Sequence, residues 1–144
     1  MLLWRLRYYQ EAAERARVEY TANTLGLALQ LHIASQLARQ RAVDYVALAL
    51  DNPVNWLDKP MLGYRGELTR GDAKRLPRGS WYFDRARGEL VYLPLRDAYL
   101  AGDDAGEKRV RFRVRLLRVQ SGTGASVAVR FEPVQPNRWL IGGG

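Results

Sequence analysis

The 144-residue sequence contains no cysteine and a single histidine, His32. The absence of cysteine excludes disulfides, thiolate metal sites and a cysteine nucleophile. A single histidine excludes a metal site built from several imidazoles, and a Ser-His-Asp triad would have to use His32 itself. We interpret His32 as a partly buried, hydrogen-bonded side chain and the carboxylates Asp84 and Glu89, which flank a predicted turn, as structural. No enzymatic activity is expected.

Long apolar runs are also missing. A helix that crosses a bilayer needs about 20 apolar residues, whereas the apolar residues 1–4 are followed at once by Arg5 and Arg7. No signal peptide of the usual form is visible. The chain as given is therefore expected to be soluble.

Acidic residues are outnumbered, with 15 Asp and Glu against 23 Lys and Arg, which gives a formal net charge of +8. Such a charge favours acidic partners, including nucleic acid, anionic lipid headgroups and acidic proteins. Arginine carries most of the charge, because the only lysines are Lys59, Lys74 and Lys108.

Glycine and proline are scarce in the first third of the chain, where only Gly26 precedes Pro53. Residues 2–41 are rich in Ala, Leu, Arg, Gln and Glu, which are good helix formers. We predict one helix over this segment, with a length of roughly 60 Å at about 1.5 Å per residue. This is long for a small domain, where helices average about 11–12 residues.

Apolar residues of this helix fall on two nearly opposite faces when they are placed at about 100° per residue. The two faces consist of Val18, Ala22, Leu25, Leu29 and Ile33, and of Tyr20, Leu27, Leu31, Ala34 and Ala38. Two faces suggest two partners, the helix's own sheet and another molecule, with Leu27, Leu31, Ala34 and Ala38 as a subunit contact. The alternative is that small alanines merely widen one buried face.

A short helix is predicted at residues 43–50, with Asp44 as its N-cap. Asp51-Asn52-Pro53 stops it, because the residue before proline avoids the helical region. Residues 52–79 contain seven glycines and prolines in all and are expected to form an irregular connection. Long connections in compact domains tend to be functional or mobile.

The remaining residues have the alternation of strands. Residues 80–84 and 89–93 flank a turn at Gly88, and residues 108–119 and 126–132 flank Gly122-Thr123-Gly124. Sequential hairpins predict an antiparallel meander of three or four strands. Val110, Phe112, Val114 and Leu116 are expected to face inward from the third strand, and Val127, Val129 and Phe131 from the fourth. Because helices and strands are segregated, the fold class is α+β, in one domain ending in a tail at residues 135–144.

Three segments resemble type IV pilins and the pseudopilins of type II secretion systems. Residues 8–16, Tyr-Tyr-Gln-Glu-Ala-Ala-Glu-Arg-Ala, look like the stretch that follows the membrane segment in this family. Residues 52–57, Asn-Pro-Val-Asn-Trp-Leu, with Lys59-Pro60 and Gly-Tyr-Arg-Gly-Glu at 63–67, look like its helix-to-sheet connection. Residues 79–84, Gly-Ser-Trp-Tyr-Phe-Asp, with Glu-Leu-Val-Tyr at 89–92, look like its first hairpin. The resemblance spans residues 1 to about 115.

This resemblance implies a pilin-like fold and a structural function, as a subunit of a periplasmic filament that drives protein secretion. It implies a leader and an apolar membrane segment ahead of this helix, so residues 2–4 are expected to be the end of that segment. The native protein would then be anchored in a bacterial inner membrane with its domain in the periplasm. Its partners would be other pilin or pseudopilin subunits and inner-membrane components of the secretion system.

Two further sets of residues carry alternatives. Arg109, Arg111, Arg113 and Arg115 alternate on one strand face at about 7 Å intervals, which loosely matches phosphate spacing and suggests a basic pilin-like protein that binds DNA. The competing interpretation is a solvated face. In the loop before this strand, Asp103 and Asp104, together with Asp97 and Glu107, form a weak calcium candidate, and no other cofactor is expected.

Overall fold

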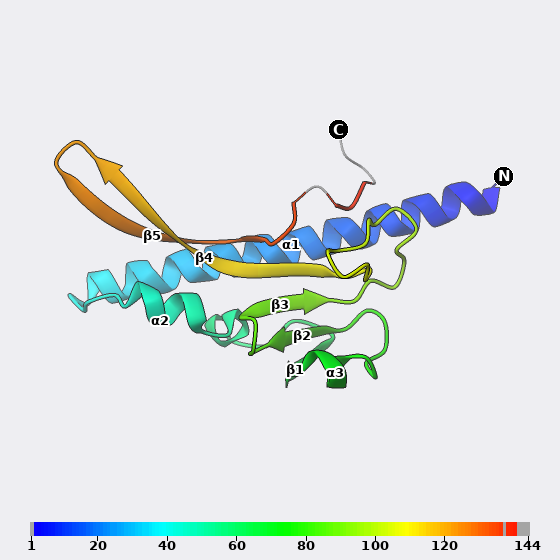
Figure 1. The fold of residues 1–144 in the computed structure, drawn as a ribbon, viewed down its shortest axis with the longest axis horizontal. Coiled ribbons are helices and arrows are strands. Elements are labelled where there is room, and N and C mark those ends of the chain that lie inside the picture. Colours follow the sequence, from blue (N-terminus) through cyan, green and yellow to red (C-terminus); the bar gives the residue numbers. More distant parts are fainter. Residues whose placement is uncertain (1, 137, 141–144) are drawn as a thin grey trace.

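In the computed structural model, residues 2–136 and 138–140 are described, and they form an α+β domain, as predicted. One long helix, α1 (Leu2–Ala38), lies across one face of a five-stranded sheet (Figure 1). The strands are β1 (Tyr64–Leu68), β2 (Trp81–Asp84), β3 (Glu89–Tyr92), β4 (Val110–Ser121) and β5 (Gly124–Pro133). Short helices α2 (Tyr45–Leu50), η1 (Pro53–Trp56) and α3 (Arg70–Ala73) lie in the connection between α1 and β2.

Helix α1 ends three residues earlier than the composition suggests. Gln40 adopts a left-handed φ of 56°, and the Gln40 and Arg41 amides donate to the carbonyls of Leu37 and Gln36. These two bonds form the Schellman arrangement that closes many helices, usually around a glycine. Because a glutamine takes the glycine's place here, the sequence carries no obvious stop signal.

The short helix α2 is confirmed and begins at the predicted cap. The Asp44 side chain accepts a 3.0 Å hydrogen bond from the Ala47 amide, which satisfies one of the free N–H groups of the first turn. Asn52 caps η1 in the same way through the Val54 amide, at 3.1 Å. These caps turn the chain from α1 toward the sheet.

Strands β2 to β5 form the predicted antiparallel meander, but the sheet has five strands instead of three or four. The additional strand, β1, lies in the connection predicted to be irregular and pairs parallel with β2. Close approach of two glycines permits this pairing: a Cβ on Gly63, whose φ is +85°, would lie 2.8 Å from the Gly79 carbonyl oxygen. Glycines that suggest a loop in the sequence thus form the junction of two strands.

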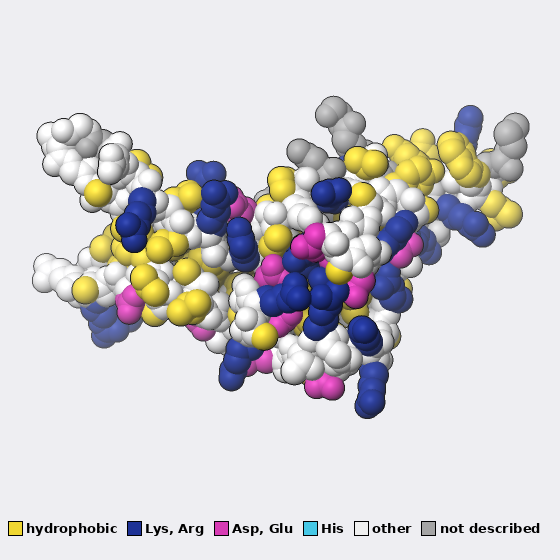
Figure 2. Space-filling view, viewed as in Figure 1, with side chains coloured by type: hydrophobic (Ala, Val, Ile, Leu, Met, Phe, Trp, Pro, Cys, Tyr) yellow, Lys and Arg dark blue, Asp and Glu magenta, His cyan; other side chains and the backbone are white. Residues whose placement is uncertain are grey.

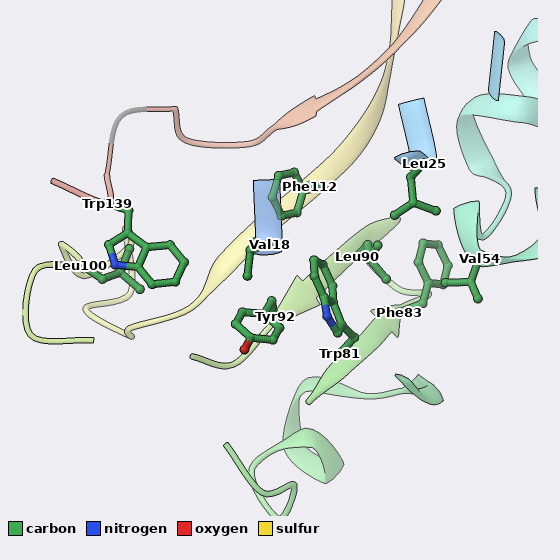
Figure 3. Packing of buried hydrophobic residues seen from close by; sticks show 10 residues of the cluster. All are labelled: Val18, Leu25, Val54, Trp81, Phe83, Leu90, Tyr92, Leu100, Phe112 and Trp139. Carbon is green, nitrogen blue, oxygen red and sulfur yellow. The ribbon is translucent and has the colours of Figure 1, made fainter. Parts of the chain in front are cut away.

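Aromatic side chains dominate the core between α1 and the sheet (Figure 3). The Trp81 ring centroid lies 4.8 Å from that of Tyr92 and 6.0 Å from that of Phe112. Val18 and Leu25 reach these rings from α1. The opposite face of the sheet has its own small cluster, in which Tyr82 and Val91 pack with Ala73 of α3. The central strands are therefore buried on both faces.

The β4–β5 hairpin extends past the core and curls away from α1 (Figure 1). Its base is buried as predicted, with Phe112, Val114 and Val129 in contact with the core. The prediction that Val127 faces inward is wrong, because this side chain lies toward the projecting end of the hairpin and is 40% exposed.

The chain after β5 returns to the core and does not simply form a tail. Trp139 is 7% exposed, belongs to the main cluster and pairs through its backbone with Leu100. The predicted tail is therefore wrong for Trp139, while residues 137 and 141–144 lie outside the described part of the chain.

Candidate subunit interface

Two carboxylates lie on the buried face of α1, in line with its apolar residues. Glu11 and Glu14 are 2% and 0% exposed, and they continue the face formed by Val18, Leu25 and Leu29. Buried carboxylates are costly unless their oxygens receive hydrogen bonds. Each of the two receives three.

Glu14 binds the segment that follows β3. Its oxygens accept hydrogen bonds from the Tyr92 hydroxyl at 2.6 Å and from the amides of Leu95 and Arg96 at 2.7 and 2.9 Å. Burial, followed by the hydrogen bond and the charge of Glu14, raises the pKa of Tyr92 above its ordinary value of 10.0. The tyrosine therefore remains a protonated donor to the carboxylate.

Glu11 binds the next turn of the same segment and the returning C-terminal residues. It accepts hydrogen bonds from the amides of Ala98 and Tyr99 at 3.0 and 2.8 Å, and from Trp139 Nε1 at 2.9 Å. Together, Glu11 and Glu14 fix residues 92–99 and Trp139 onto α1. Hydrogen bonds thus hold the buried face of α1 to the rest of the domain in the first half of the helix, and aliphatic packing holds it in the second half.

The patterns read from the sequence did not single out Glu11 or Glu14 as buried residues. A signal for their burial was present, because Glu11 lies seven residues before Val18, which lies seven before Leu25. Seven residues are close to two helical turns, so the three share a face. Continuing this seven-residue spacing toward the N-terminus would have placed the carboxylates on the face of α1 that packs against the sheet.

The opposite face of α1 is an exposed apolar stripe that runs along the entire helix. Tyr20, Leu27 and Leu31 are 75%, 61% and 61% exposed. All members of the stripe are exposed and follow one another at intervals of three or four residues, broken only at Asn23: Leu2, Leu6, Tyr9, Ala13, Ala16, Tyr20, Leu27, Leu31, Ala34 and Ala38. The alternative that alanines widen one buried face is wrong, because the stripe lies opposite Val18, Leu25 and Leu29.

The N-terminal turns of α1 project beyond the sheet (Figure 1). Leu2, Leu3 and Trp4 are 85%, 71% and 65% exposed, and hydrophobic side chains gather on this end of the molecule in the space-filling view (Figure 2). No helix in the described part of the chain has both the length and the apolar character to cross a membrane.

The four alternating arginines do not form one exposed row. Arg109 and Arg111 are buried, where Arg109 binds Asp103 and Arg111 binds Glu89 at 3.2 Å. Arg113 and Arg115 are exposed, and Arg115 pairs with Glu132 at 3.2 Å. The expected solvated face is wrong for its first half, because carboxylates from β3 and from the 103–107 loop cover it.

The calcium candidates Asp103 and Asp104 lie in this same cluster. Asp103 accepts hydrogen bonds from Arg109 Nε and from the amides of Ala105 and Glu107, both at 2.9 Å, while Asp104 pairs with Arg111 at 3.3 Å. Burial alone would raise the pKa of Asp103, but these bonds outweigh burial and lower the pKa below 3.8. Across residues 2–136 and 138–140, His, Asp and Glu side chains form no group of three suited to a metal.

The side chains considered for catalysis have structural neighbours. His32 is half-buried and shares a 3.0 Å hydrogen bond with Gln36, as predicted. Asp84 and Glu89 face each other across the β2–β3 hairpin and are both buried. Asp84 accepts from the Arg87 amide, and Glu89 binds Arg111.

No family model, curated protein or solved structure matches this chain. Its function is therefore inferred from the geometry. The exposed apolar stripe is the main feature considered, because it has no partner within the described part of the domain.

Proposed function

We propose that this chain is the water-facing domain of a structural subunit in a type IV pilin-like filament, a pseudopilus of type II secretion. The observation that carries the proposal is the apolar stripe on the exposed side of α1. The order of elements supports it as well, since a long N-terminal helix precedes a largely antiparallel sheet.

The stripe has the geometry of a helix-packing seam. Apolar residues at alternating intervals of three and four allow one helix to insert its side chains between those of another. The stripe extends for about 55 Å at 1.5 Å per residue, with one interruption at Asn23. Large exposed apolar patches mark protein–protein or membrane contacts. A second helix, supplied by another subunit, would cover the stripe.

Rigid attachment of the sheet directs the stripe outward. Glu11 and Glu14 fix the loop after β3 and Trp139 on the opposite side of α1, so the domain cannot rotate about the helix to bury the stripe. Copies of the chain could then pack helix against helix with their sheets outside. In the native protein, we propose an inner-membrane anchor ahead of this helix, a periplasmic domain, and secretion-system subunits as partners.

The DNA-binding alternative loses its main support, because Arg109 and Arg111 are engaged by buried carboxylates. Arg109 and Arg111 therefore do not join Arg113 and Arg115 in one exposed row along a nucleic-acid backbone.

The direct test places charge on the stripe of the membrane-anchored protein in its native host. Leu27→Glu combined with Leu31→Glu should abolish filament assembly, while the isolated domain keeps its circular dichroism spectrum and melting temperature. Leu62→Glu is the matched control, because Leu62 is 98% exposed and lies outside α1. Normal assembly of the double variant, or unfolding of its domain, would exclude the stripe as the subunit contact.

Because residues 1–144 contain no cysteine, single cysteines can map the contact by crosslinking. Ala34→Cys and Ala38→Cys, introduced singly into the anchored protein, should form disulfide-linked dimers on oxidation if neighbouring helices approach there. A cysteine at Leu62 should remain uncrosslinked.

A further inference from the structure

A hollow of about 310 Å³ opens on the face of the sheet that α1 does not cover. Its floor is apolar and includes Ala73, Tyr82 and Leu93, from the cluster beneath α3. Basic side chains gather over this region in the space-filling view (Figure 2). Those that line the hollow are Arg70, Lys74, Arg78, Lys108 and Arg109.

The lining has five basic residues and one acidic residue, Glu107, so its net charge is positive. Acidic partners balance the charges of two arginines, since Arg70 binds Glu107 at 2.8 Å and Arg78 binds Asp97 at 2.9 Å. The two lysines differ from the arginines in this respect. In the described part of the chain, Lys74 has no ion pair, and Lys108 Nζ binds only the neutral Asp97 carbonyl, at 2.9 Å.

Arg109 adds a deeply buried charge to the same wall. Its side chain is 2% exposed, and its Nη2 atom is buried without a hydrogen-bond partner among the described residues. A buried donor left unpaired is uncommon and calls for an explanation. Asp103 and Glu107 already balance the charge of this guanidinium. A bound anion would supply the missing acceptor for Nη2 and the counter-charge for the two lysines.

We propose that this hollow binds a phosphate group. A phosphate monoester carries up to two negative charges and several acceptor oxygens, which suits two lysines without acidic partners better than a singly charged carboxylate does. Lysine ammonium groups bind phosphate as mobile point charges. Two of the three lysines in the chain lie here. Both inorganic phosphate and the phosphomonoester headgroup of phosphatidic acid supply this chemistry.

The small number of lysines permits a direct footprint. The domain is treated with an amine-acetylating reagent, and the rate at each lysine is measured by mass spectrometry. One arm compares inorganic phosphate with chloride at equal ionic strength, and the other compares vesicles that contain phosphatidic acid with vesicles of phosphatidylcholine alone. Bound phosphate should slow acetylation of Lys74 and Lys108 about tenfold at a concentration ten times its Kd. Lys59 is the internal control, because it lies outside the hollow.

Protection of Lys74 and Lys108 by inorganic phosphate supports a site for the free ion, and protection by phosphatidic acid alone supports a headgroup site. No protection in either arm, or equal protection of Lys59, overturns the proposal. In equilibrium dialysis with whichever probe protects, Lys74→Ala should weaken binding about tenfold, the effect of one charge-assisted hydrogen bond. Lys59→Ala should leave binding unchanged, and equal weakening by both variants would also overturn the proposal. These outcomes do not depend on filament assembly.

Discussion

The two faces of α1 have opposite environments. One carries Glu11 and Glu14 in a fully buried position, where each carboxylate receives three hydrogen bonds. The other carries Leu27 and Leu31 in water. Polarity alone would predict that the glutamates are exposed and the leucines buried. The comparison shows that position along the helical repeat decides burial here, and that the exposed leucines are available to a second helix.

Removal of a buried carboxylate is expected to have the largest effect on stability. Glu14→Ala leaves the Tyr92 hydroxyl and two backbone amides without an acceptor, so the free energy of unfolding should fall by about 3–5 kcal/mol in urea denaturation. The control is Glu19→Ala, since Glu19 is exposed and, among the described residues, pairs with Arg15 alone, one turn away. Its loss should be at most about 0.5 kcal/mol. Similar losses for the two variants would mean that Glu14 does not anchor the loop.

Two leucines in the second half of the helix allow the buried and exposed faces to be compared with the same substitution. Leu29 is fully buried and Leu31 is 61% exposed. Leu29→Ala should lower the free energy of unfolding by about 2–5 kcal/mol, because it leaves a cavity in the core. Leu31→Ala should change it by less than about 0.5 kcal/mol, since alanine favours the helix and no core contact is lost. Equal destabilisation by the two variants would place the stripe in the core.

The elements that the sequence predicts correctly are those whose pattern is local. Alternation identifies β4 and β5, and the turn at Gly88 identifies the β2–β3 hairpin. The helical repeat identifies the buried and exposed sides of α1. In each case the residues that decide the structure are neighbours in the chain, so composition and spacing carry the information.

The features that the sequence does not reveal depend on distant partners. Parallel pairing of β1 requires Gly79 opposite Gly63, and burial of Arg111 requires Glu89 of another strand beside it. The Trp139 contact with Glu11 joins residues from opposite ends of the chain. Strand alternation places arginine on one face, but it does not indicate whether carboxylates from elsewhere cover that face.

The smallest expected effect concerns the hydroxyl that joins the sheet to the buried face of α1. Tyr92→Phe removes one hydrogen bond to Glu14 and should cost about 1–3 kcal/mol at pH 7. Tyr20→Phe, on the exposed face, should leave the free energy of unfolding at pH 7 unchanged. Equal changes in the free energy of unfolding would mean that the buried Tyr92 hydroxyl stabilises the fold no more than the exposed Tyr20 hydroxyl does.

The pH dependence of the same variant tests the contact independently. The pKa of Tyr92 is raised in the folded state by burial and by Glu14, so above pH 10 the unfolded chain loses this proton while the folded chain keeps it. The stabilising contribution of Tyr92 is therefore complete below pH 10 and declines at higher pH. Denaturation curves between pH 9 and 11 should show the wild type losing up to about 1.4 kcal/mol more per pH unit than Tyr92→Phe. Parallel declines would mean that the Tyr92–Glu14 contact does not resist ionisation, and the carboxylate would then be bound mainly by the Leu95 and Arg96 amides.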